Sequence, residues 1–381
     1  MRLAAISLVA MLVACGGSGP RAATSASQAP SASATITSLP TSSSLPTSSP
    51  ASAQGCRLPV AELPPGATDP ARRDVGFVSV PGGTLSLATD AITYDRDSGI
   101  FRTTSQPYLY GQDAETFDEA VGRWVPTAWQ LVSPDGSEYA YQAPGTLDPA
   151  TNSYGPSSIH IVHVASAIDR VVDQQNAYPV AFVRGGLFVG IPNATASDPR
   201  NPTETLLLLD PSTGSTRQLG KSVVGWSVAA GNYLFGTDLN PADPSPLIQS
   251  PMEPAMSAAP DRAWQLDLQT GAAAQWLYRP GRLVEVAGID SEGRLIAVVV
   301  GFDKTEVWAL TAPETGARIY EGPGHNQIDP LGLGNFGIQS PGIADTNGFW
   351  LPSGTGIVLY SASSGFKLVY KGQAVPAGVC S

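Results

Sequence analysis

Three cysteines and three histidines are the side chains of this chain with the widest choice of chemistry. Cys15 follows an apolar run, Cys56 follows a Ser/Thr/Pro-rich stretch, and Cys380 is the penultimate residue. A thiol can be alkylated, form a disulfide or bind a metal ion. Two cysteines without neighbouring histidines provide too few ligands for a structural metal site. These positions therefore favour alkylation and disulfide formation.

The histidines are weak evidence for a catalytic or metal site. His160 and His163 lie in an apolar stretch over residues 159–164 that predicts a strand, so we expect His160 to be packed inside and His163 to lie in the next turn. His325 lies in a long loop, residues 322–342, where an exposed imidazole could be functional. A single loop histidine does not define a site.

Established catalytic motifs are absent from the sequence. It has no Gly-x-Ser-x-Gly elbow, no His-Glu-x-x-His and no EF-hand spacing, and residues 214–222 lack the spacing and the following helix of a phosphate loop. Glycoside cleavage needs two carboxylates facing one pocket, and the acidic residues are expected at the solvated surface. We assign no catalytic residue, no metal ligand and no cofactor. The acidic residues considered are Asp290, Glu292, Asp329 and Asp345.

The first residues predict export. Arg2 is followed by an apolar run over residues 3–14, shorter than the roughly 20 residues of a membrane-spanning helix. The run ends in Leu12-Val13-Ala14-Cys15-Gly16, which resembles the lipobox of bacterial lipoproteins. The resemblance implies that residues 1–14 are a cleaved signal peptide and that Cys15 is lipidated; an ordinary secreted protein cut nearby is the alternative. We expect a bacterial cell-envelope protein on the outer face of the cytoplasmic membrane, or in the periplasm or at the outer membrane of a two-membrane host.

A tether is expected over residues 15–55. Its composition is Ser, Thr, Ala and Pro, with Arg21 the only charge and almost no large apolar side chain. Such a segment buries too little surface to offset its chain entropy, so we expect disorder. It would hold the following domain away from the membrane.

Cys56 and Cys380 remain once Cys15 is lipidated, and we predict that they form a disulfide. The expected compartment is oxidising, and the two ends of a domain commonly lie close together. Two free thiols are the alternative.

Residues 56–381 are rich in Gly and Pro and lack a convincing amphipathic helix, which indicates an all-β domain. Apolar strands and short turns recur in the same order about every 50 residues, the length of one four-stranded propeller blade. Five copies begin near Trp129, Val180, Trp226, Asp290 and Asp345. In the first of them we expect four strands: the apolar stretch that begins at Trp129, then residues 138–142, 159–164 and 169–172. The segment over residues 76–127 is less regular and has two predicted hairpins, over residues 95–99 and 118–122, where one blade would need one. We therefore predict a single β-propeller of six blades, with seven as the alternative, closing at the Cys56 to Cys380 seam.

Two turn motifs carry a family resemblance. Ser133-Pro134-Asp135-Gly136 precedes a strand, and Asp-x-x-Thr-Gly hairpins at residues 210–214 and 267–271 join outer strands. These turns resemble those of TolB-like and WD40-like β-propellers. The resemblance implies the fold, and it implies no activity.

The formal net charge of −11 argues against binding to nucleic acid and against electrostatic adhesion to anionic lipid. We therefore expect membrane attachment through the lipid anchor only, a neutral or cationic partner, with protein or glycan as ligand, and a monomer. Two insertions are the candidate binding loops because they carry apolar side chains that a solvated loop does not need. Packing onto the blades beneath is the alternative. The candidate residues are Leu247, Ile248, Met252 and Met256 in the first insertion, and His325, Leu331, Leu333 and Phe336 in the second.

Two functions remain open. The first, which we favour, is a surface-tethered binding or scaffold module, which predicts a rim without convergent titratable groups. The second is an extracytoplasmic hydrolase or lyase acting on glycan or peptide, which predicts clustered carboxylates or His325 at the channel mouth with a perturbed pKa.

Overall fold

The architecture comes from a computed structural model of the chain. The predicted signal peptide, Cys15 and almost all of the predicted tether lie outside the residues that it describes. Those residues are 55–63, 74–88, 116–143, 145, 147–148, 150, 153–166, 168–172, 176–193, 203–222, 224–240, 260–325, 327–333 and 341–381.

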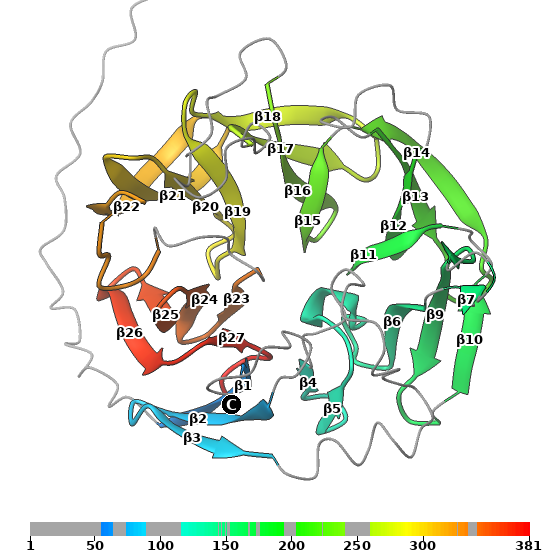
Figure 1. Cartoon of the computed structure of the whole chain (residues 1–381), viewed down its shortest axis with the longest axis horizontal. Helices are drawn as coiled ribbons and strands as arrows, with labels where there is room; N and C mark the ends of the chain where they lie inside the picture. The colour runs from blue at the N-terminus through cyan, green and yellow to red at the C-terminus, as the bar shows by residue number, and fades with distance from the viewer. Residues whose placement is uncertain are drawn as a thin grey trace, which may run out of the picture. The chain divides into compact units, whose positions relative to one another are not determined.

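Six antiparallel sheets follow one another around a ring, which confirms the predicted six-bladed β-propeller (Figure 1). Each complete blade is a meander whose first strand lies nearest the centre. Blade 3 contains β11 (Tyr178–Val183), β12 (Gly186–Pro192), β13 (Glu204–Leu209) and β14 (Thr216–Ser222), and blade 4 contains β15 (Gly225–Ala230), β16 (Tyr233–Asp238), β17 (Arg262–Asp267) and β18 (Ala273–Tyr278). Blade 5 contains β19 (Leu283–Ile289), β20 (Leu295–Val300), β21 (Lys304–Ala312) and β22 (Thr315–Pro323). Blade 6 contains β23 (Ile343–Asp345), β24 (Gly348–Ser353), β25 (Gly356–Ser361) and β26 (Gly365–Lys371).

Blade 1 is assembled from both ends of the domain. The order in its sheet is β27 (Ala374–Pro376), β1 (Cys56–Glu62), β2 (Asp74–Val80) and β3 (Thr84–Leu87), so the last strand of the chain is the innermost strand of the first blade. The disulfide between Cys56 and Cys380 lies beside this junction, with Cα atoms 5.5 Å apart. Both the predicted pairing and the predicted seam are therefore confirmed.

Blade 2 departs from the expected four-strand meander. Its sheet contains β6 (Glu138–Ala143), β9 (Ser158–His163) and β10 (Ile168–Val172). The apolar stretch predicted as its first strand instead forms a 3-10 turn, η1 (Trp129–Leu131), followed by a single β-bridge between Val132 and Tyr139. That prediction was wrong, because apolar character alone does not separate a short strand from a buried turn.

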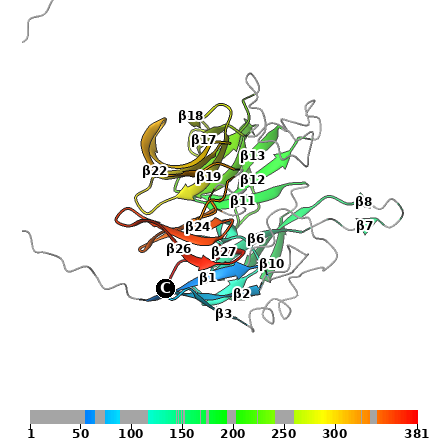
Figure 2. The ribbon, with the colours of Figure 1, turned by 60° about the vertical axis from the view of Figure 1, so that its left-hand side comes forward.

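Two small hairpins complete the described strands. The pair β4 (Thr116–Asp118) and β5 (Arg123–Val125) accounts for the irregular sequence before blade 2. The pair β7 (Leu147–Asp148) and β8 (Ser153–Tyr154) projects from blade 2 (Figure 2). The other predicted hairpin, over residues 95–99, lies outside the described residues. In the part of the chain that is described, no helix is long and apolar enough to cross a membrane.

Apolar clusters join neighbouring blades around the whole ring. Strand β20, for example, is buried at all six positions, because its two faces pack against different blades. Between blades 1 and 2 the hairpin β4–β5 fills the gap: Trp124 packs with blade 1 and Val125 with blade 2. The core is thus a closed series of interfaces between sheets.

Local sequence explains the repeated outer hairpins. In the turn after β13, Asp210 Oδ1 accepts the backbone N–H of Ser212 at 2.8 Å, and Gly214 has φ of +75°. In the turn after β17, Asp267 Oδ1 accepts the N–H of Gln269 at 2.7 Å. A β-bulge also recurs between the third and fourth strands of blades 3 to 6. Because a bulge increases the local twist of a strand pair, these blades share a local distortion as well as the same order of strands.

Candidate functional site

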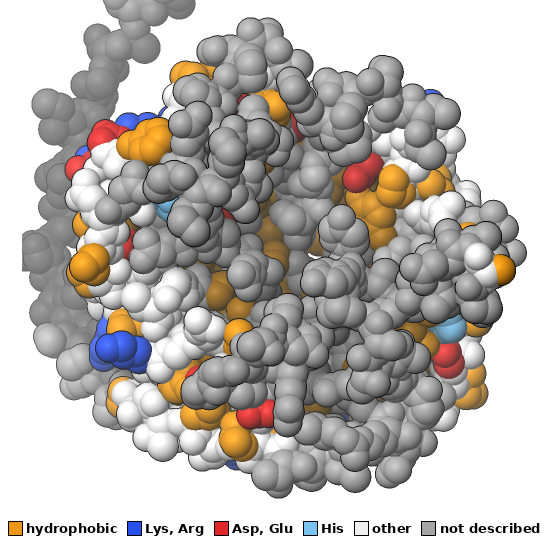
Figure 3. Space-filling view, in the orientation of Figure 1, with side chains coloured by type: hydrophobic (Ala, Val, Ile, Leu, Met, Phe, Trp, Pro, Cys, Tyr) orange, Lys and Arg blue, Asp and Glu red, His pale blue; other side chains and the backbone are white. Residues whose placement is uncertain are grey.

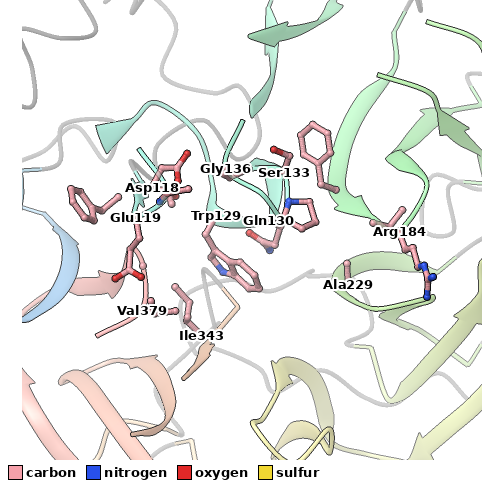
Figure 4. A pocket seen from close by; sticks show the side chains of 18 of the residues that line it. Asp118, Glu119, Trp129, Gln130, Ser133, Gly136, Arg184, Ala229, Ile343 and Val379 are labelled. Atoms are coloured by element: carbon pink, nitrogen blue, oxygen red, sulfur yellow. Dashed lines mark hydrogen bonds between the residues drawn. The ribbon is translucent and has the colours of Figure 1, made fainter. Parts of the chain in front are cut away.

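A pocket with a volume of about 660 Å³ lies at the centre of the ring (Figure 4). Five of the six blades contribute to its wall through their innermost strands or first turns, together with the hairpin β4–β5. A volume of several hundred Å³ and a mainly apolar wall with a few polar groups are typical of small-molecule sites. The wall includes Phe117, Asp118, Trp129, Gln130, Phe182, Arg184, Ile343 and Val379.

Three polar atoms in this wall are buried and have no hydrogen-bond partner: Asp118 Oδ2, Trp129 Nε1 and Gln130 Oε1. They are half of the six such side-chain atoms among the described residues. An unpaired buried polar group costs about 1 to 3 kcal/mol, so such atoms are rare away from functional sites. Their concentration around one pocket marks it as the candidate site.

The orientation of Gln130 follows from its other contact. Its Nε2 donates to the backbone carbonyl of Ser227 on β15, 3.1 Å away. Because a carbonyl only accepts, the amide nitrogen must face blade 4 and the amide oxygen is the atom left without a donor. Figure 4 shows Trp129 and Gln130 between Asp118 and Glu119 on one side and Arg184 on the other.

Asp118 is held at the end of β4. Its Oδ1 accepts the backbone N–H of Ala120 at 3.0 Å, and the residue is 5% exposed. Burial raises the pKa of Asp118; the N–H groups of Ala120 and Val121 oppose that shift, and the charge of Asp135 adds to it. The carboxyl group is therefore a poorly solvated acceptor that a ligand donor would stabilise.

The structure leaves most predicted loop residues apart from this pocket. Leu247, Ile248, Met252, Met256 and Phe336 lie outside the described residues. Leu333 is buried in the apolar cluster between blades 5 and 6, and Leu331 packs against that cluster. His325 is partly buried, and its backbone N–H donates to the carbonyl of Gly301.

The other two histidines lie on β9. His163 is the exposed last residue of β9, and its Nδ1 lies 3.0 Å from Ser166 Oγ in the turn that follows, so it stands at the start of the turn in which it was expected. His160 lies on the predicted third strand, but its side chain is 16% exposed rather than fully packed. The expected interior position was therefore only partly correct, because Asp169 and Val171 on the neighbouring edge strand β10 are exposed.

Three of the four acidic residues expected at the solvated surface have structural partners instead. Asp290 forms an ion pair with Arg294 at 2.7 Å, Asp329 accepts from the Tyr320 hydroxyl at 2.7 Å, and Asp345 accepts from Trp350 Nε1 at 2.7 Å. Only Glu292 is largely exposed. In the described part of the chain, no group of three or more His, Cys, Asp or Glu side chains is arranged to hold a metal ion.

Sequence reasoning missed the central site. Asp118 was expected only in a hairpin and Trp129 only in a strand, and neither position carries a motif. The available signal was weak: a tryptophan and a glutamine next to each other, just before the Ser133 turn.

Comparisons with known proteins add little to this description. No protein-family model and no curated protein matches the chain. Among solved structures, an oligogalacturonate lyase in complex with manganese is 12% identical over 63% of each chain, with a TM-score of 0.42. An oligogalacturonate lyase from Vibrio parahaemolyticus is 10% identical over 63% of this chain and 64% of that one, with a TM-score of 0.41. A protein described as TolB from Agrobacterium tumefaciens is 11% identical over 62% of this chain and 86% of that one, with a TM-score of 0.36.

The chain spans less than two thirds of the length of either lyase. Likenesses at this distance carry no argument about activity. The class of the protein rests on its own strand order: it is an all-β, six-bladed β-propeller closed by a strand from its C-terminus.

Proposed function

We propose that this protein is a membrane-anchored, extracytoplasmic β-propeller lipoprotein that binds a small ligand in its central pocket. The observation that carries the proposal is the set of unpartnered atoms of Asp118, Trp129 and Gln130 in the wall of that pocket. A rigid ring with one apolar central pocket is suited to binding, and the pocket wall contains no histidine or cysteine.

The unpartnered atoms define the ligand chemistry. Two of them are acceptors, Asp118 Oδ2 and Gln130 Oε1, and one is a donor, Trp129 Nε1. A ligand hydroxyl group can donate a hydrogen bond to either acceptor or accept one from the indole N–H, and the apolar wall favours a ligand without charge. An uncharged polyhydroxylated compound, such as a neutral sugar unit, meets both requirements. Because the three atoms are shielded from solvent, binding requires small rotations of these side chains.

The pocket is tested with the full-length chain and a panel of neutral mono- and disaccharides, using thermal unfolding and calorimetry. We expect at least one neutral sugar to raise the melting temperature, and Trp129→Phe to reduce its affinity about tenfold through loss of the indole N–H. Trp264→Phe is the matched control, since its Nε1 donates to Asp238 Oδ1, outside the pocket.

If no sugar in the panel binds, the neutral-sugar assignment is refuted. If Trp129→Phe and Trp264→Phe reduce the affinity for the sugar equally, the assignment of the central pocket as the binding site is refuted. Conversion of a bound sugar to products would instead favour the alternative function, a hydrolase or lyase acting on glycans.

The anchor is tested separately, through Cys15 in the Leu-Val-Ala-Cys-Gly segment. We expect the wild-type chain to fractionate with membranes and to incorporate an alkynyl fatty acid, because several acyl chains anchor a protein stably. The Cys15→Ser variant should lose both properties. Membrane association and labelling that persist in Cys15→Ser would show that this thiol is not the anchor.

A further inference from the structure

A second cluster of reactive side chains lies on the outer half of blade 2. Ser158 and His160 are two residues apart on β9, so their side chains share one face of the sheet. Asp169 lies on the neighbouring strand β10. Ser158 Oγ lies 3.1 Å from His160 Nε2, and His160 Nδ1 lies 2.9 Å from Asp169 Oδ2. The three side chains thus form a continuous hydrogen-bonded chain.

The protonation pattern of this chain follows from its partners. A carboxylate oxygen only accepts, so His160 Nδ1 must carry the proton that is directed at Asp169. In the tautomer with this proton on Nδ1, the lone pair is at Nε2, where it can accept a hydrogen bond from the Ser158 hydroxyl 3.1 Å away. This tautomer, which the contact with Asp169 favours, is the one in which a histidine can remove a proton from a serine.

Tyr141 on β6 fixes the imidazole from another side. Its hydroxyl donates to Asp169 Oδ2 at 2.9 Å, and its ring stacks on His160 with centroids 4.7 Å apart. Burial and the nearby Asp169 charge raise the pKa of Tyr141, so its hydroxyl stays protonated and remains a donor. The base is therefore held by two contacts in addition to the serine.

We propose that Ser158 is a nucleophile activated by His160 and that this site hydrolyses small uncharged carboxylic esters. A nucleophile, a base within hydrogen-bond reach and a third group that orients the base are the geometric requirements for such chemistry. Asp169 and Tyr141 are positioning residues. This activity is independent of ligand binding in the central pocket.

In the first step, Ser158 Oγ attacks the ester carbonyl carbon while His160 Nε2 takes the hydroxyl proton. The tetrahedral intermediate collapses, the carbon–oxygen bond to the alcohol breaks, and the proton passes from His160 to the leaving alcohol. In the second step, water attacks the acyl-serine, His160 again accepts and returns a proton, and a carboxylic acid is released. Ester and water are consumed, and alcohol and acid are formed.

The surroundings of the site favour an uncharged substrate with a short apolar acyl group. Val171 pairs directly with His160 across the sheet and is 57% exposed, which gives an apolar surface beside the serine. The Asp169 charge and the formal net charge of −11 disfavour anions. The Asp169 side chain is 31% exposed, so water screens its charge and we expect slow turnover.

The experiment treats the full-length chain with an alkyl fluorophosphonate and locates the adduct by peptide mass spectrometry. Attack by Ser158 Oγ on phosphorus displaces fluoride and leaves a stable phosphonyl-serine. We expect wild-type protein to be labelled at Ser158 and to release p-nitrophenol from p-nitrophenyl acetate. His160→Gln should slow labelling about 100-fold, the usual contribution of a positioned base, and Asp169→Asn about tenfold.

Ser157→Ala is the matched control, since the neighbouring hydroxyl only accepts from Gln142 Nε2 at 2.8 Å; its labelling rate should equal that of wild type. Wild-type protein that forms no adduct at Ser158 would overturn the proposal without reference to any variant. The proposal would also be overturned if a His160→Gln variant with the circular dichroism spectrum of wild type were labelled at the wild-type rate. The hydrogen-bonded chain would then have only a structural role.

Discussion

Glu306 shows how neighbouring charges determine the state of a single buried carboxylate. It is on β21, with its side chain 7% exposed, and forms ion pairs with Lys304 at 2.6 Å and Arg318 at 3.0 Å. Burial alone would raise the pKa of Glu306, but hydrogen bonds from Lys304, Arg318 and Trp308 outweigh it and lower the pKa to about 2. The ionised form is therefore the one that stabilises blade 5.

Lowering the pH should reduce the free energy of unfolding of the wild-type protein by more than it reduces that of a Glu306→Gln variant. The folded-state pKa lies below the ordinary value of 4.5, so the stabilisation is complete above about pH 4.5 and is lost as the pH falls toward 2. Urea unfolding at pH 5 and at pH 2.5 measures the difference. Glu292→Gln is the control, because the Glu292 side chain is 54% exposed and pairs with Arg294 rather than with Lys304 or Arg318; it should keep the wild-type difference in stability between the two pH values. A Glu306→Gln variant with that same difference would contradict the assignment.

Gly136 illustrates a steric requirement at the pocket wall. Its φ is +68°, and a Cβ at this position would lie 2.5 Å from both Ala120 Cβ and Asp118 Oδ1. We expect Gly136→Ala to lower the free energy of unfolding by about 2 to 3 kcal/mol, from backbone strain plus crowding. Gly293→Ala separates the two effects, because Gly293 has φ of +79° with open space around it and should cost only about 1 kcal/mol.

Chemical denaturation of both glycine variants provides the measurement. Equal costs would mean that the contact between Asp118 and the Ser133 turn does not constrain this part of the wall.

At the scale of elements, β27 is the strand whose placement matters most. It pairs with β1 through Val60 and Pro376, and the chain beyond it continues the contact, with the Ala377 N–H donating to the Pro59 carbonyl at 2.9 Å. Ala374 and Val375 are buried. The strand therefore completes the hydrogen bonding and the apolar core of blade 1.

Deletion of residues 373–381 should destabilise the ring more than removal of the disulfide alone. Relative to a Cys56→Ser/Cys380→Ser double variant, we expect a further loss of at least about 2 kcal/mol, since a buried valine alone contributes roughly that much. Urea titrations followed by tryptophan fluorescence compare the two proteins. If both unfold at the same urea concentration, β27 does not contribute to closure beyond carrying Cys380.

At the scale of the whole molecule, the ring has no free end among its described blades. Every blade interface has an apolar cluster, and the seam is secured by both strand exchange and a disulfide across 324 residues. Among the described side chains on the face shown in Figure 3, hydrophobic ones are visible toward the middle and charged ones form small separate groups.

Reduction of the disulfide should lower the free energy of unfolding by about 2 to 5 kcal/mol while leaving the fold intact. The bridge limits the unfolded chain, whereas β27 and the apolar clusters hold the folded ring. Unfolding curves with and without a thiol reductant, together with far-ultraviolet circular dichroism, test both parts. Loss of the β-sheet signal on reduction would show that the bridge is required for the fold itself.

The sequence by itself determined the blade repeat, the turns and the cysteine pairing. Alternating apolar residues and Asp-x-x-Thr-Gly turns act within a few residues, so their consequences can be derived locally.

Only the tertiary structure decided which distant groups meet. Gln130 reaches Ser227 on blade 4, Asp118 lies against Gly136, and β27 joins a sheet that begins more than 300 residues earlier. His160 and Asp169 are close in sequence, yet their contact depends on the register of β9 against β10. These contacts depend on how the sheets close into a ring, and no local pattern encodes that closure.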